Sequence, residues 1–118
     1  MSNKINYREE VKRTAGVSLE SDSFKDQLLL GATGLAGEGG EVVDLIKKHV
    51  FHKKPLDKDA LIKELGDVRW YLEYLMLANN ITMSEVEDAN IKKLRARYPN
   101  GFNFEDANKR ADENKVVS

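Results

Sequence analysis

Apolar residues recur at helical spacing along most of this chain. The clearest run advances in alternating steps of four and three residues: Leu61, Leu65, Val68, Leu72 and Leu75. That period predicts a helix that begins after Asp57 and ends near Asn79. Because no segment alternates apolar and polar residues as a half-buried strand does, the pattern predicts an all-α fold.

Capping residues mark two helices before this one. Asn6 is a good N-cap for a short first helix, which Gly16 is expected to end. Ser23 can open a second helix, expected to run through a glycine-rich segment to about Lys53. Pro55 then separates the second helix from the third.

A last helix is predicted towards the end of the chain. Thr82 and Glu85 have the spacing of a capping box, and Tyr98-Pro99 is a natural stop. From residue 103 the sequence is polar and weakly patterned, so 103–118 is expected to be a flexible tail. Three substantial helices and a short one predict a bundle of about four helices, forming a single domain over residues 1–118.

The third helix is apolar around most of its circumference. Beyond its main apolar stripe it carries Trp70, Tyr71, Tyr74, Met76 and Leu77. A bundle this small cannot cover every side of such a helix. We therefore expect homo-oligomerisation, as a homodimer or a homotetramer.

Composition excludes several classes of protein. Apolar residues make up 41% of the chain, charged residues 33%, and the net charge is −1, so no basic field favours nucleic acid or an anionic membrane. No apolar run reaches membrane-spanning length, and the polar start lacks a signal peptide. Without cysteine, disulfides and thiolate metal sites are excluded. A cytoplasmic protein is expected.

Two pairs of acids stand out within apolar sequence. Glu38 and Glu41 are three residues apart, as are Glu64 and Asp67, so each pair lies on one face of a helix. If the two helices pack antiparallel, the pairs face each other at a similar depth. Four acids in a half-buried place repel unless a cation neutralises them, and a set of carboxylates suits Mg²⁺ or Mn²⁺. A single pair of this kind is usually part of a solvated helix face.

Glycine surrounds these acids. Five glycines fall within ten residues: Gly31, Gly34, Gly37, Gly39 and Gly40. A glycine inside a helix costs about 0.5–1 kcal/mol relative to alanine. We expect these glycines to let a neighbouring helix or a ligand approach the backbone closely.

Three stretches together resemble a known family. They are GLAGEGGEVVDLIKKHVFH, LIKELGDVRWYLEYL and ANIKKLRARYPNGF, and they resemble the MazG-like all-α nucleoside triphosphate pyrophosphohydrolases from about Leu28 to Phe102. The family signature is EExxE followed by ExxD. Glu38 and Glu41 match its second and third acids, whereas Gly37 replaces the first. Glu64 and Asp67 match ExxD. Because Gly37 replaces the first acid, the number of metal ions and the identity of the general base stay open.

The resemblance implies hydrolysis of an NTP or dNTP to the monophosphate and pyrophosphate. It implies Mg²⁺, or Mn²⁺, bound by the catalytic acids Glu38, Glu41, Glu64 and Asp67. It also carries over nucleotide-binding roles to Asn90, Lys93, Arg97 and Tyr98, of which the first three form a stripe along one helix face. Trp70 follows the acids within a turn and is a candidate for stacking on the base, although an aromatic residue there also suits the core or an interface. The alternative is a non-catalytic helical interaction or oligomerisation module.

Overall fold

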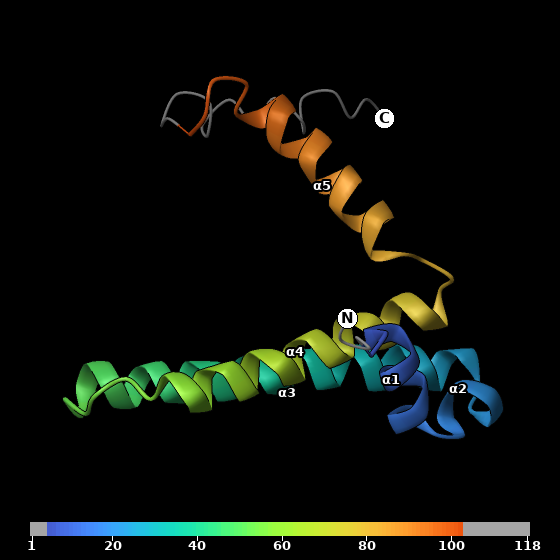
Figure 1. Ribbon diagram of the computed structural model, residues 1–118, viewed down its shortest axis with the longest axis horizontal. Coiled ribbons are helices and arrows are strands. Elements are labelled where there is room, and N and C mark those ends of the chain that lie inside the picture. The colour runs from blue at the N-terminus through green and yellow to red at the C-terminus, as the bar shows by residue number, and fades with distance from the viewer. Residues whose placement is uncertain (1–4, 103–118) are drawn as a thin grey trace. The chain divides into compact units, whose positions relative to one another are not determined.

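The computed structural model describes residues 5–102 of the chain, and the predicted tail at 103–118 lies outside them. Five helices follow one another in Figure 1: α1 (Tyr7–Ala15), α2 (Ser18–Ser21), α3 (Phe24–Phe51), α4 (Lys58–Ala78) and α5 (Met83–Arg97). No strand occurs between residues 5 and 102, where the one β feature is an isolated bridge from Pro99 to Gly101. The all-α prediction is therefore confirmed.

Four of the five helices begin where the sequence predicts. An N-cap side chain accepts a hydrogen bond from the backbone N–H three residues on at each of these starts: Asn6, Ser23, Asp57 and Thr82. At Thr82 the capping box is complete, because the Glu85 carboxylate also accepts from the Thr82 N–H at 3.1 Å. Each such cap is worth about 0.5–2 kcal/mol.

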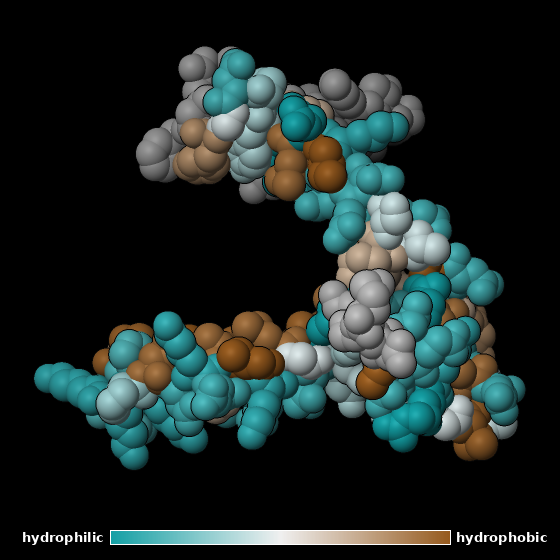
Figure 2. All heavy atoms as spheres, in the orientation of Figure 1, coloured by the Kyte–Doolittle hydropathy of each residue, from teal (hydrophilic) through white to brown (hydrophobic). Residues whose placement is uncertain are grey.

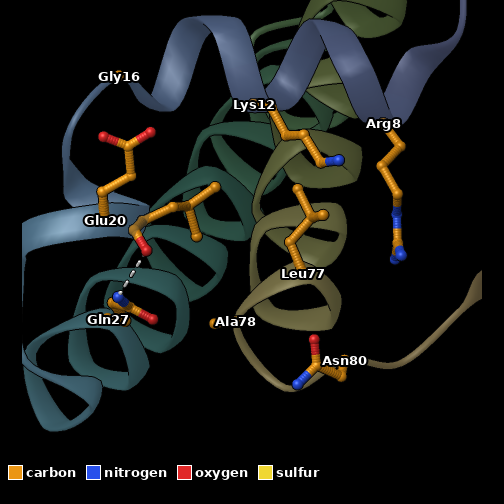
Figure 3. A pocket seen from close by; sticks show the side chains of 9 residues that line it. Arg8, Lys12, Gly16, Glu20, Gln27, Leu77, Ala78 and Asn80 are labelled. Atoms are coloured by element: carbon orange, nitrogen blue, oxygen red, sulfur yellow. Dashed lines mark hydrogen bonds between the residues drawn. The ribbon is translucent and has the colours of Figure 1, made fainter.

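The short helix α2 was missed, and one boundary differs from prediction. Four residues are too few to show an apolar period. What holds α2 in place is Gln27 of α3, which is 8% exposed. Its amide donates to the carbonyl oxygens of Ser18 and Asp22 at 3.2 Å and of Leu19 at 3.3 Å, and Figure 3 draws the last of these as a dashed line. The helix predicted to reach Lys53 ends at Phe51.

The described residues fall into two compact units, one up to Asn80 and one from Ile81. The single domain expected over 1–118 therefore stays a prediction. In the first unit α3 and α4 lie side by side as a helical hairpin (Figure 1). Their register is antiparallel: Gly31 meets Leu75, whereas Gly34, further along α3, meets Tyr71, further back on α4.

Two glycines make this contact close. A Cβ built on Gly31 would lie 2.5 Å from Leu75 Cγ, nearer than real Cβ atoms approach. A Cβ on Gly34 would overlap the Tyr71 ring in the same way. At Gly37, Gly39 and Gly40 a Cβ would meet nothing within 4 Å. The expectation that glycines allow close helix packing therefore holds for two of the five, and the other three face open space.

The core of the first unit is small. Val11 of α1 and Tyr74 of α4 are fully buried, and Met76 is nearly so. Figure 2 shows apolar side chains along one long edge of the hairpin and hydrophilic ones along the other. Large apolar residues stay exposed on the half of the hairpin nearest its turn: Val43, Ile46, Val50, Phe51, Ile62 and Leu65. Those on α3 also line one groove.

The described part of the second unit contains α5 and the turn after it. Gly101 in that turn has a φ of 83°, a conformation that glycine adopts without strain. No residue of α5 is buried, and Val86, Ile91 and Leu94 are each more than two-fifths exposed. Between residues 81 and 102, α5 has no second helix against which to bury these side chains.

Candidate metal centre

The hairpin register brings acids of α3 and α4 together. One carboxylate oxygen each from Glu38, Glu64 and Asp67 lies within 4.8 Å of the others. Glu38 and Glu64 are half-buried, and Asp67 is exposed. Mg²⁺ binds oxygen ligands at about 2.0–2.1 Å, so oxygens on opposite sides of one ion are about 4 Å apart. The three carboxylates are therefore spaced suitably for a shared divalent cation.

Two features of the acids fit a bound cation. Burial and then the negative charge of Asp67, with smaller effects from Glu64 and Glu41, raise the pKa of Glu38 above its usual value. Glu64 Oε2 is buried and has no hydrogen-bond partner in the described part of the chain. A divalent cation would offset the repulsion and give the Glu64 oxygen a partner.

Glu41 lies outside the group of three. It is on α3 one turn beyond Glu38, and its side chain is exposed. Its charge still contributes to the raised pKa of Glu38. The structure thus brings three of the four predicted acids together, and a role for Glu41 in binding the metal stays a prediction.

A cavity of about 280 Å³ opens beside the acids, lined by Glu38, Asp67, Trp70 and Tyr71. The Trp70 ring meets Tyr71 edge-on, with centroids 5.0 Å apart and planes at 77°. It also stacks on Tyr74, at 5.5 Å and 18°. Trp70 and Tyr71 thus form an aromatic wall of this cavity, within reach of a ligand. Trp70 is the residue proposed from its position after the acids.

The predicted nucleotide-binding residues of α5 belong to the second unit. Asn90 and Lys93 are exposed and line the same shallow hollow. Arg97 is the last residue of the helix, and Tyr98 caps it with its N–H donating to the Leu94 carbonyl at 2.8 Å. Their part in binding a nucleotide stays a prediction.

Sequence reasoning missed a buried ion-pair network one turn beyond the aromatic wall. Glu73 of α4 is 3% exposed and accepts from Arg8 Nε of α1 at 2.5 Å. Its other oxygen lies 2.8 Å from Arg69 Nη1, and the Arg69 guanidinium is 4.6 Å from the centroid of the Tyr7 ring. The spacing of Arg69 and Glu73 by four residues was the only local signal, because Arg8 lies 65 residues away from Glu73 in the chain.

A second, larger cavity does not resemble a metal site. It measures about 540 Å³ and lies where α1 and α2 meet the end of α4 (Figure 3). Arg8 and Lys12 project into it from α1, and Glu20 is the only acid in its lining. Among residues 5–102, the one set of three acids able to share an ion is the group on the hairpin.

The chain matches a known protein family. Residues 28–102 match the MazG nucleotide pyrophosphohydrolase domain, and the chain belongs to that family. Members of that family are described as nucleotide pyrophosphohydrolases. The match includes all three clustered acids and α5.

A relative of this chain is the Gene 37 protein of Mycobacterium phage L5. The two are 36% identical over an alignment of 72 residues, and the match covers 58% of this chain and 63% of the relative's length. No solved structure matches the chain. Between residues 5 and 102 no helix has the length and apolar character needed to cross a membrane.

Proposed function

We propose that this protein hydrolyses an NTP or dNTP to the monophosphate and pyrophosphate, using a divalent cation held by Glu38, Glu64 and Asp67. The observation that carries the proposal is the convergence of these three carboxylates across the hairpin, within 4.8 Å of one another. Family membership supports the reaction class. We assign Glu41, the fourth acid of the signature, to the same centre through a bridging water.

The carboxylates determine which ion suits the site. Oxygen ligands without histidine or cysteine favour Mg²⁺, and Mn²⁺ is the natural substitute. Such an ion, when bound, supplies charge neutralisation at phosphate oxygens and makes a coordinated water more acidic. Glu38 and Glu64 would hold it from opposite helices, so the hairpin itself sets the distance between the ligands.

The aromatic wall offers a surface for the base. Trp70 and Tyr71 line the same cavity as Glu38 and Asp67, so a nucleotide whose phosphates reach the acids has an aromatic side chain beside it. On α5 the cationic Lys93 and Arg97 suit phosphate oxygens. Asn90 and Tyr98 belong to the same sequence block and are included on the strength of the family resemblance.

We further propose that the protein acts in the cytoplasm as a homodimer or homotetramer. A largely apolar groove on α3 supports association; its lining is Val42, Val43, Ile46, Lys47, Val50 and Phe51. Burying this groove against a second copy would remove apolar surface from water at a gain of about 25 cal/mol per Å². Neither nucleic acid nor a membrane is needed as a partner.

A panel of NTPs and dNTPs, each with Mg²⁺ or Mn²⁺, tests the reaction when pyrophosphate and orthophosphate are measured separately. We expect pyrophosphate, metal dependence, and loss of activity in Asp67→Asn with the oligomer intact. Asp44→Asn, an exposed acid of α3 outside the cluster, is the matched control and should retain activity. Release of orthophosphate alone would contradict the position of cleavage. If no nucleotide is turned over, the non-catalytic interaction module becomes the better explanation.

A further inference from the structure

Helix α1 touches the aromatic wall although it precedes the family-matched region, which begins at residue 28. The indole Nε1 of Trp70 donates to Thr14 Oγ1 at 2.7 Å, across 56 residues of sequence. The Thr14 hydroxyl in turn donates to the Glu10 carbonyl at 2.8 Å. Its proton is thus directed to the helix backbone, and its oxygen is presented to the indole.

The Thr14 contact restrains Trp70 in a way that its ring contacts do not. Stacking on Tyr74 sets the plane of the indole but tolerates sliding and rotation within that plane. A hydrogen bond is directional, so the bond to Thr14 fixes where the Nε1 edge points. Tyr74 is itself tied to the N-terminal segment, since its hydroxyl lies 3.2 Å from Ser18 Oγ.

We propose that Thr14 is a positioning residue that fixes the Trp70 indole beside the acid cavity, so that α1 contributes to recognition of the nucleotide base. The proposal rests on the proposed function, in which Trp70 faces the base. Thr14 acts only through Trp70, because the residues that line the cavity are Glu38, Asp67, Trp70 and Tyr71. Losing the bond should weaken base binding and leave the chemistry at the acids unchanged.

The chain is well suited to a test because Trp70 is its only tryptophan. Intrinsic fluorescence and the tryptophan bands of near-ultraviolet circular dichroism therefore report on this one ring. Thr14→Val removes the hydroxyl at nearly constant shape, and Thr14→Ser keeps it. Thr33→Val is the matched control, since Thr33 is an exposed residue of α3 whose hydroxyl likewise donates to a helix carbonyl, that of Leu29, at 2.6 Å.

We expect Thr14→Val to shift the emission maximum and weaken the tryptophan dichroism. The substrate is whichever of dATP, dCTP, dGTP and dTTP the wild type hydrolyses fastest with Mg²⁺. For this substrate KM should rise about 3- to 10-fold relative to wild type, which is the net free energy of one hydrogen bond, and kcat should stay within about twofold. Thr14→Ser should restore both readouts, and Thr33→Val should change neither. In a Trp70→Phe background, adding Thr14→Val should raise KM no further.

Each failure has its own signature. If the wild type is active but Thr14→Val matches it in spectrum and KM, or Thr14→Ser behaves like Thr14→Val, the positioning role is overturned and the proposed function stands. A rise in KM that persists in the Trp70→Phe background also overturns it, because the effect then bypasses the indole. If the wild type hydrolyses no nucleotide, the proposed function fails, and the proposal about base recognition fails with it.

Discussion

Glu64 differs from the other acids of the hairpin in having a buried oxygen, Oε2, without a hydrogen-bond partner in the described structure. A buried polar atom left in this state costs about 1–3 kcal/mol. Glu41 pays no such cost, because it is exposed to water. A cation therefore has more to contribute at Glu64 than at Glu41, and the two acids should not be equivalent.

This difference predicts a hierarchy among variants of the acids. Glu64→Gln should lower kcat/KM for pyrophosphate release by about 100-fold or more, since it removes a direct ligand. Glu41→Gln should cost about 10-fold, as expected for a group that acts on the metal through water. Titrations of activity with Mg²⁺ measure both effects, with Asp44→Asn as the unaffected control. A greater loss in Glu41→Gln than in Glu64→Gln would contradict the placement of the ion between Glu38, Glu64 and Asp67.

Glu73 is the acid most firmly held in place. Burial acts to raise the pKa of Glu73, but hydrogen bonds from Arg8 and Arg69 outweigh it, and the pKa lies below the ordinary glutamate value. A lowered pKa in the folded state means that the unfolded chain binds the proton more readily. The ion pairs therefore stabilise the fold above the unfolded pKa, and this stability is lost as pH falls through the folded pKa.

The pH dependence of stability tests this network. Glu73→Gln should lower the free energy of unfolding by about 1–3 kcal/mol at pH 7, because the two arginines then lose their carboxylate partner. The gap between wild type and variant should close as the pH falls below the ordinary glutamate pKa and on through the lowered pKa of folded Glu73, because Glu73 of the wild type then becomes neutral too. Urea unfolding of both proteins at several pH values measures this difference in stability. Glu87→Gln, an exposed residue of α5, should stay within about 0.5 kcal/mol throughout; an unchanging gap for Glu73→Gln would rule out the titration of Glu73 as its cause.

At the scale of elements, local chemistry made the helices predictable. Asn6, Ser23, Asp57 and Thr82 cap the helices that the sequence assigned to them, because a cap depends on residues three apart. Matching depth on either side of the turn likewise predicted that Glu38 would meet Glu64 and Asp67. What the sequence could not reveal was the direction of the Glu41 side chain, or α2, whose place depends on the buried Gln27.

The glycines of α3 show the same limit. Their number predicts close packing, but only the rotation of α3 about its axis decides which of them face α4. Gly31 and Gly34 face Leu75 and Tyr71, whereas Gly37 faces open space. Long-range pairs such as Arg8 with Glu73 could not be predicted from the sequence for a related reason, since no local pattern links residues so far apart in the chain.

Two alanine substitutions on the same helix separate packing from helix propensity. Gly37→Ala should stabilise the protein by about 0.5–1 kcal/mol, because the new methyl group meets no atom and the unfolded chain loses freedom. Gly31→Ala gains the same propensity but forces its methyl group against Leu75 and Tyr74, with a net loss of about 1–3 kcal/mol. Thermal melts of both variants measure the difference. Equal stabilisation by the two substitutions would show that α3 and α4 are not in this register.

At the scale of the whole molecule, the balance between buried and exposed apolar residues favours association. The core of the first unit rests on Val11, Tyr74 and Met76, whereas Phe51 is 73% exposed and Val50 is 55% exposed. Marginal stability is normal for a small domain, and burial of an exposed apolar face on association is a common way to increase it. The groove on α3 begins at Val42, about one helical turn after Glu38, so association through it would take place near the acids in the sequence of α3.

An added charge on an apolar position of the groove tests association. Val50→Lys places an ammonium group where a second copy would have to bury it without a partner, so the dissociation constant should rise at least about 100-fold. Thr33→Lys introduces the same side chain at an exposed position of α3 outside the groove and should leave association unchanged. Sedimentation velocity over a range of protein concentrations distinguishes monomer from dimer or tetramer, and a melt at each concentration reports stability. If the wild type sediments as a monomer throughout, or Val50→Lys associates as well as Thr33→Lys does, the groove is not the interface. If Val50→Lys becomes monomeric and also loses pyrophosphate release while Thr33→Lys keeps it, then association supports the metal centre as well as the fold.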